Sequence, residues 1–217
     1  MIKLNLNNSL ILGLAFTSGF IIMSIELLGG RILAPYFGSS IYVWGSIITV
    51  FMLSLSVGYL TGGRLSLHNP SLKRHAGFFI LGGIAILPII LWANEVMETV
   101  FIAVEDPRYG SLIVSMLLFF IPTVILGMIS PYSVRLLVID SHHSGNVAGS
   151  LYFVSTLGSA LGTLGTSFYL VLWFEVNQIL MVMSGALLLA GMAAILGYYR
   201  LPMAMGQPDQ KITGELS

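Results

Sequence analysis

Residues 10–30 read LILGLAFTSGFIIMSIELLGG, and Glu26 is the single charged side chain in this stretch. An apolar run of this length crosses the roughly 30 Å hydrocarbon core of a bilayer as one α-helix. The run follows a short start that carries Lys3, as a signal peptide would, but it has no small-residue cleavage site before Leu28. The stretch therefore predicts a retained transmembrane helix.

Five further apolar stretches follow, at about residues 41–62, 77–96, 112–129, 147–174 and 179–199. Each is long enough to span a bilayer. The chain of 217 residues is 56% hydrophobic and 8% charged, whereas about a quarter of the residues are charged in an ordinary soluble domain. The sequence thus predicts an all-α membrane protein, with a six-helix transmembrane domain over residues 1–200 and a flexible cytoplasmic tail over residues 201–217.

The positive charges fall unevenly between the two sides of these helices. Two of the nine Lys and Arg residues, Arg31 and Arg108, lie on the side that also collects most of the acidic residues. The other side holds Lys3, Arg64, Lys73, Arg74, Arg135, Arg200 and Lys211. The positive-inside rule therefore predicts that both termini are cytoplasmic. The formal net charge is zero, so no overall field favours a nucleic-acid partner.

Several kinds of chemistry have no support in the sequence. The chain has no cysteine, which excludes disulfides and thiolate metal sites. His142 and His143 are adjacent, a poor spacing for two ligands of one metal, and we interpret them as solvated. No set of nucleophile, base and orienting residue stands out, and no phosphate-binding glycine loop is present. We therefore expect no metal, no cofactor and no catalysis by this chain alone.

Glu26 carries the most information, because a carboxylate inside a transmembrane helix is costly unless it is protonated, paired or in contact with water. Arg31 is the nearest cation, but five residues on a regular helix place the two on different faces. Gly29 and Gly30 lie between them, and a break there would let the guanidinium fold back onto the carboxylate. Otherwise each needs a partner from another helix. A structural pair and a binding or proton-coupling site both fit.

The segment after Arg31 is rich in aromatic and hydroxyl residues, including Tyr36 and Trp44. An interfacial aromatic belt explains these residues. A shallow outward-facing pocket explains them as well, since aromatic faces and a carboxylate together attract an organic cation. Both interpretations are kept.

Pairs of small residues predict close helix contacts, which hold helices together in lipid. Gly58 and Gly62 are four residues apart, as are Gly158 and Gly162. These pairs indicate packing inside one chain or, alternatively, the seam of a homodimer. On the predicted cytoplasmic side, Arg64, Lys73, Arg74 and Arg135 serve positive-inside anchoring, contact with anionic lipid, or the clamping of an anionic group.

Taken together, these motifs resemble the membrane domain of the bacterial spermidine synthase-like integral membrane proteins. The resemblance is carried by ELLGGRILAPYFGSS at residues 26–40, YVW at 42–44 and GYLTGGR at 58–64. In the second half it is carried by GMISP at 127–131, Arg135 and NVAGSLYFVSTLGSALGT at 146–163. It covers about residues 18–175. The loop from Gly62 to Arg74 is also similar, more weakly, to one in the major facilitator superfamily, so six helices would equal half of such a transporter.

The resemblance implies a multi-pass protein of the bacterial inner membrane that is related to polyamine aminopropyltransferases. Longer members carry a cytoplasmic synthase domain, which has no counterpart after Arg200. We therefore expect a membrane module that binds a small polar or amine-related solute, or docks a separate soluble enzyme of that kind. The alternative is a homodimeric half-size transporter with Glu26 as its cation or proton site. The candidate ligand-binding residues are Glu26, Arg31, Tyr36, Trp44, Tyr132, Arg135, Tyr152 and Ser155, and the candidate docking residues are Arg64, Lys73 and Arg74.

Overall fold

The computed structural model describes residues 6–138 and 144–200 of the chain. These residues form helices and connecting turns, with no strand among them. Six helical segments in the described residues are long and apolar enough to cross a membrane, which confirms the predicted all-α class. Lys3, His142, His143, Lys211 and the predicted tail over residues 201–217 lie outside the described residues.

Four of the six spans are single helices: α1 (Leu6–Phe37), α2 (Ile41–Leu65), α3 (Leu72–Ala103) and α8 (Val176–Arg200). The fourth span consists of α4 (Pro107–Gly127) and α5 (Ile129–Leu137), and Met128 separates them. Pro131 lacks the backbone N–H that would bond to the Gly127 carbonyl, which accounts for an interruption at this point. The fifth span consists of α6 (Ser144–Gly165), the π-helix η2 (Thr166–Leu170) and α7 (Val171–Trp173).

Most of these helices are longer than the apolar runs that predict them, because residues flanking each run continue the same helix. Of the two alternatives left open for Gly29 and Gly30, the structure shows the unbroken one, because α1 is continuous from Leu6 to Phe37. Gly30 instead lies against the ring of Trp44 in α2, where a Cβ atom would come within 2.6 Å of the ring. The glycine pair therefore serves close packing.

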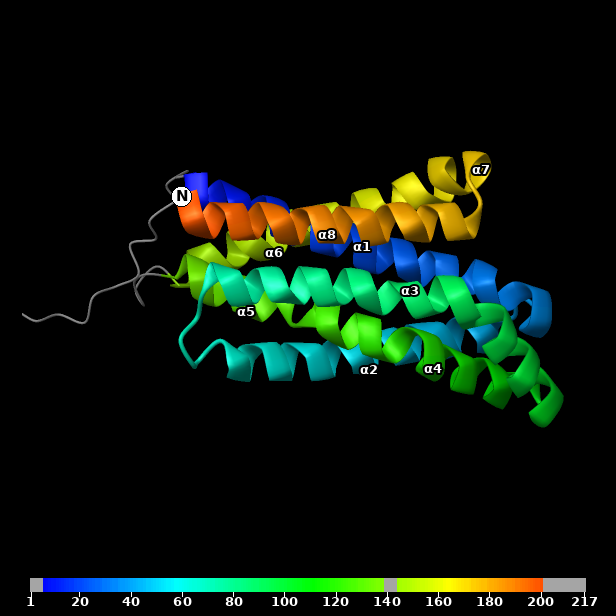
Figure 1. The fold of residues 1–217 in the computed structure, drawn as a ribbon. Helices are drawn as coiled ribbons and strands as arrows, with labels where there is room; N and C mark the ends of the chain where they lie inside the picture. The colour runs from blue at the N-terminus through cyan, green and yellow to red at the C-terminus, as the bar shows by residue number, and fades with distance from the viewer. Residues whose placement is uncertain (1–5, 139–143, 201–217) are drawn as a thin grey trace, which may run out of the picture.

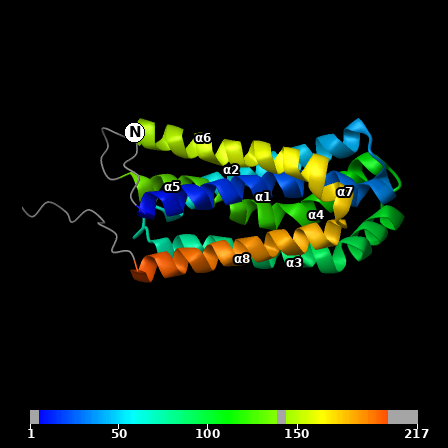
Figure 2. The same ribbon diagram turned by 90° about the horizontal axis from the view of Figure 1, so that it is seen from above.

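Three pairs of helices pack most closely: α1 with α6, α2 with α4, and α3 with α8 (Figures 1 and 2). The start of α1 and the end of α8 lie at the same end of the bundle, which we call the terminal end (Figure 1). The turns after α1, α3 and α7 lie at the opposite end, which we call the far end. The terminal end carries Arg64, Lys73, Arg74, Arg135 and Arg200.

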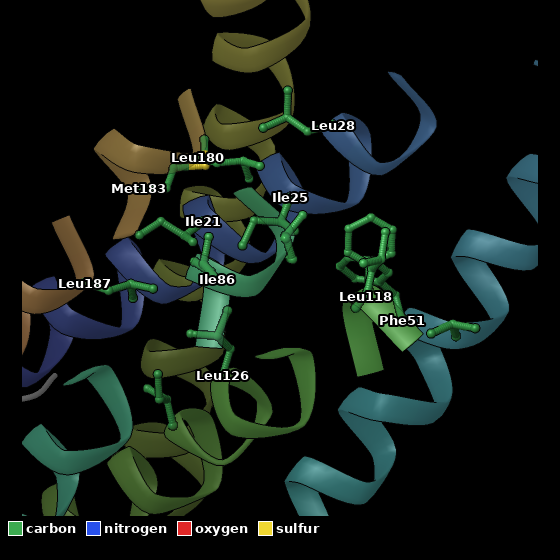
Figure 3. Close-up of a cluster of buried hydrophobic side chains, with 14 of the residues drawn as sticks. Ile21, Ile25, Leu28, Phe51, Ile86, Leu118, Leu126, Leu180, Met183 and Leu187 are labelled. Atoms are coloured by element: carbon green, nitrogen blue, oxygen red, sulfur yellow. The ribbon is translucent and has the colours of Figure 1, made fainter. Parts of the chain in front are cut away.

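The core is filled by branched and aromatic side chains from α1, α2, α3, α4 and α8 (Figure 3). Ile25 and Leu28 of α1 meet Leu180 and Met183 of α8, and all four are buried. Phe51 of α2 packs against Phe119 of α4, with ring centroids 5.6 Å apart. The hollows recorded in the described residues are lined instead by residues of the outer faces and the helix ends.

The four glycines singled out in the sequence lie in contacts between helices of one chain. A Cβ atom on Gly158 or Gly162 of α6 would collide with the backbone of Phe16 or Phe20 in α1. A Cβ atom on Gly58 would meet the Val124 carbonyl, and one on Gly62 would lie 2.5 Å from the Met128 carbonyl oxygen. Only glycine allows these backbones to approach so closely.

Candidate functional site

A hollow lined by hydroxyl groups lies between α2, α5 and α6, and we call it the hydroxyl pocket. Its volume is about 380 Å³. Its lining consists of two tyrosines, four serine or threonine side chains and one proline: Tyr59, Ser130, Pro131, Tyr152, Ser155, Thr156 and Ser159. Tyr59 is 48% exposed and Tyr152 is 54% exposed, so the pocket opens to the outside of the bundle. Two of the predicted ligand-binding residues, Tyr152 and Ser155, therefore share one pocket.

The helices explain why hydroxyl groups gather here. Tyr152, Ser155 and Ser159 are three or four residues apart, a spacing that places them on one face of α6. Ser159 is held by hydrogen bonds from its Oγ to the Gly19 carbonyl of α1 and to the Ser155 carbonyl, both 3.2 Å long. The hydroxyl groups of Ser155 and Thr156 make no side-chain hydrogen bond within the described residues, so they are free to meet a ligand.

Glu26 lies on the face of α1 that also carries Gly19 and Gly30, and we call this face between α6 and α2, together with the hydroxyl pocket, the groove. It is two helical turns beyond Gly19, which contacts Ser155 and Ser159 of α6, and one turn before Gly30, which contacts Trp44 of α2. The carboxyl group thus lies between α6 and α2, about 10 Å along the helix from Gly19. The side chain is partly buried. Within residues 6–138 and 144–200 it has neither a hydrogen bond nor an ion pair, which is costly for a carboxylate at membrane depth.

Arg31 does not pair with Glu26 as one interpretation of the sequence allows. Its Nη1 donates a hydrogen bond of 3.0 Å to the Val171 carbonyl at the end of η2. This carbonyl has no partner within its own helix, because α7 ends at Trp173 before a fourth following residue can donate. Arg31 also borders a hollow of about 590 Å³ at the far end, together with Trp173, Glu175 and Gln178. Its hydrogen bond is therefore to the end of the fifth span and not to Glu26.

Tyr36 and Trp44 pack at the far end as well. The Tyr36 ring lies edge-on to that of Phe101 in α3, with centroids 5.9 Å apart. Trp44 covers Gly30, one turn beyond Glu26 on the same side of α1. A second hollow of about 370 Å³ lies near Tyr42, above whose ring the Arg108 guanidinium sits at 4.6 Å from the centroid. Of the aromatic residues in this segment, Trp44 is the one that adjoins Glu26.

Tyr132 and Arg135 point away from the hydroxyl pocket. Tyr132 is fully buried, and its hydroxyl oxygen accepts a 3.0 Å hydrogen bond from the backbone N–H of Ser71, the residue that caps α3. Its ring stacks on that of His75 at a centroid distance of 5.8 Å. Arg135 is exposed at the terminal end. Tyr132 therefore joins α5 to α3.

The candidate docking residues lie near the turn between α2 and α3. Arg64 and Lys73 are exposed. Arg74 is also exposed, but its Nη1 donates to the His68 carbonyl, and its backbone N–H donates to the Ser71 Oγ over 3.2 Å. Arg74 therefore stabilises the turn itself, whereas Arg64 and Lys73 are available for a partner or for lipid headgroups.

Sequence reasoning missed Tyr59, Thr156 and Ser159 as candidate ligand-binding residues. Tyr59 follows Gly58, and Ser159 lies between Gly158 and Gly162, so helix packing already explained these segments. It also missed His75, which is buried, shares a 2.8 Å hydrogen bond between its Nε2 and Ser133 Oγ, and leaves Nδ1 without a partner. His75 follows Lys73 and Arg74, and that basic context is typical of an exposed loop.

Comparisons with protein-family models, with curated proteins and with solved structures found no match to this chain. The resemblance to the spermidine synthase-like membrane family is therefore a hypothesis drawn from the sequence motifs. The fold and the site are argued from the geometry of this chain.

Proposed function

We propose that this chain is a half-size membrane carrier that pairs with a second copy and binds a small organic cation between them. The observation that carries the proposal is the groove between α2 and α6, which joins the hydroxyl pocket to the carboxyl group of Glu26. Among the described residues, this carboxyl group has no partner. Glu26 supplies the countercharge, and the tyrosine rings of the pocket favour an ammonium group.

Two features support a second copy rather than lipid on this face. A carboxylate in direct contact with hydrocarbon costs several kcal/mol, so the face needs water or protein beside it. The span that contains α6 is also the least covered: 17% of its most apolar window is buried, against 33–50% in the other five spans. A partner on this face encloses the groove and turns an open hollow into a pathway.

The test is uptake of radiolabelled tetraethylammonium into proteoliposomes. The Glu26→Gln variant is expected to lose uptake by about tenfold or more, since a tenfold change corresponds to about 1.4 kcal/mol of lost interaction. Glu98→Gln is the matched control, because Glu98 is an exposed carboxylate in α3, away from the groove. Equal uptake by the wild-type protein, Glu26→Gln and protein-free liposomes would contradict the proposal.

A second candidate function is a membrane module that docks a soluble aminopropyltransferase-like enzyme, as the family resemblance implies. The observation in its favour is the exposure of Arg64, Lys73 and Arg135 at the terminal end. A photo-crosslinker at position 73 is expected to capture such an enzyme. The capture should fall when Arg64 and Arg135 are replaced by Glu. A protein that is active in transport and captures no such enzyme would exclude this function.

A further inference from the structure

The contacts of the helix pair α1–α6 are repeated by the pair α4–α2. Gly158 and Gly162 of α6 meet the carbonyls of Phe16 and Phe20 in α1, and Gly58 and Gly62 of α2 meet those of Val124 and Met128. The reverse contacts correspond too, because Gly19 of α1 meets Ser155 while Gly127 of α4 meets Leu55. Adding 100 to a position in α2 gives its counterpart in α6, and adding 108 to a position in α1 gives its counterpart in α4. With these two shifts, the three contacts of one helix pair become those of the other.

The third helix pair completes the pattern. A Cβ atom on Gly83 of α3 would lie 3.0 Å from the Ser184 carbonyl oxygen, and the Ser184 Oγ donates a 2.8 Å hydrogen bond to the Gly83 carbonyl. These two positions differ by 101, so α3 and α8 are paired with each other at corresponding positions. Residues 6–103 thus form one three-helix unit, and residues 107–138 together with 144–200 form a second copy of it. The copies have opposite directions across the membrane, as in transporters built from inverted repeats.

The same position shifts map the residues of the hydroxyl pocket onto a second set of residues, which lies nearer the far end. Tyr59 and Ser159 correspond to each other, so both residues belong to the hydroxyl pocket and to the second set. The other pocket residues correspond to Ile22 and Met23 in α1 and to Met52, Leu55 and Ser56 in α2. Glu26 lies one turn beyond Met23 on α1. The carboxyl group that has no partner in the described residues therefore lies beside this set of residues, one turn along α1.

The two ends of the groove differ in the size of the side chain at one pair of corresponding positions. Trp44 covers Gly30 at the far end, and its corresponding position at the terminal end is Ser144. A bulky ring therefore covers Gly30 one turn from Glu26, whereas the corresponding position holds a small side chain.

We propose that the groove holds a second position for the organic cation, formed by Met23, Glu26, Ser56 and Ser159 and closed at the far end by Trp44. This proposal rests on the proposed function and deepens it. The cation moves between the Glu26 position and the hydroxyl pocket, which lie end to end along the groove. Movement of Trp44 off Gly30 opens the far-end position.

The absence of native cysteine allows a direct test by thiol labelling. Ser56→Cys reports on the far-end position and Thr156→Cys on its counterpart in the hydroxyl pocket. A membrane-impermeant thiosulfonate is applied from each side of sealed vesicles. Thr156→Cys is expected to react from the side of the terminal end, while Ser56→Cys reacts slowly. Adding Trp44→Ala should increase labelling of Ser56→Cys from the far end by about fivefold or more, which corresponds to about 1 kcal/mol.

Tetraethylammonium at saturating concentration is expected to protect both cysteines, because both lie in the path of the cation. Leu117→Cys is the control, since this exposed residue of α4 should react at the same low rate in every condition. If Ser56→Cys responds neither to Trp44→Ala nor to tetraethylammonium while Glu26-dependent uptake persists, the second position is disproved and the proposed function stands. If tetraethylammonium protects both cysteines but the protein does not take it up, transport is disproved and the two binding positions stand.

Discussion

Single glycines set the tightest steric limits in this bundle. A Cβ atom on Gly158 would overlap the carbonyl group of Phe16, which is backbone and cannot rotate away. Gly185 in α8 has no atom within 4 Å of the corresponding point. The two glycines are alike in sequence context, since both lie inside long apolar helices, and they differ in what surrounds them.

We therefore expect Gly158→Ala to lower the free energy of unfolding by about 1–3 kcal/mol, because α1 and α6 must separate to admit the methyl group. Gly185→Ala is expected to be neutral or to stabilise by up to about 1 kcal/mol, as alanine has the higher helix propensity. Thermal unfolding of both variants in detergent measures the difference. Equal melting temperatures would show that this close contact contributes little.

At the scale of elements, the irregular end of the fifth span is held by side-chain hydrogen bonds to α1. The π-helix η2 is fixed at its start by Thr166, whose Oγ1 donates a 2.8 Å hydrogen bond to Ser24 Oγ of α1. It is fixed at its end by Arg31, which donates to the Val171 carbonyl. A π-helix is rare and is often found at functional sites, and this one lies in the span that lines the groove.

Replacing Arg31 by Gln is expected to loosen the far end of this span, because the amide is too short to reach the Val171 carbonyl. Hydrogen exchange should increase for the backbone amides of residues 171–176 and stay unchanged for residues 150–160 in the same span. Unchanged exchange over 171–176 would show that packing alone holds this end. Arg108→Gln is a matched control, since Arg108 is another arginine at the far end and contacts Asp106.

At the scale of the whole molecule, the arrangement of helices separates a closed side from an open one. The α3–α8 pair lies on one side of the bundle, and α2 and α6 lie on the other (Figure 2). The groove between α2 and α6 contains the hydroxyl pocket and Glu26, and we infer that a second copy covers it. A copy docked on α3 and α8 would leave the carboxyl group facing lipid.

Single cysteines test this arrangement in the membrane. Tyr152→Cys on the groove face of α6 is expected to form a disulfide between two copies under mild oxidation, giving a band at twice the mass of the chain. Leu91→Cys on α3, which is also exposed, is expected to stay monomeric. A disulfide from the α3 cysteine alone would place the partner on the α3–α8 face and contradict the arrangement. Monomers with both cysteines would exclude a homodimer through α6.

The sequence by itself determined the membrane class and the number of helices. Apolar runs of this length are stable in the hydrocarbon core of a bilayer and not in water. Their length and composition therefore predict the membrane class without any tertiary contact. It also pointed to Glu26, since a carboxylate at membrane depth is costly unless it is protonated, paired or in contact with water. The two glycine pairs were visible as well, although the sequence left their partners open between the same chain and a second copy.

Only the tertiary structure decided which polar groups meet. Tyr132 and Tyr152 looked equally suited to a ligand, but the turn of each helix buries Tyr132 against α3 and exposes Tyr152 in the pocket. Arg31 and Glu26 are five residues apart, yet Arg31 bonds to the Val171 carbonyl, which the end of α7 leaves free, 140 positions further along the chain. Such contacts depend on how helices rotate and pair, and in lipid that is set by close packing of small residues over long sequence separations, which no local pattern encodes.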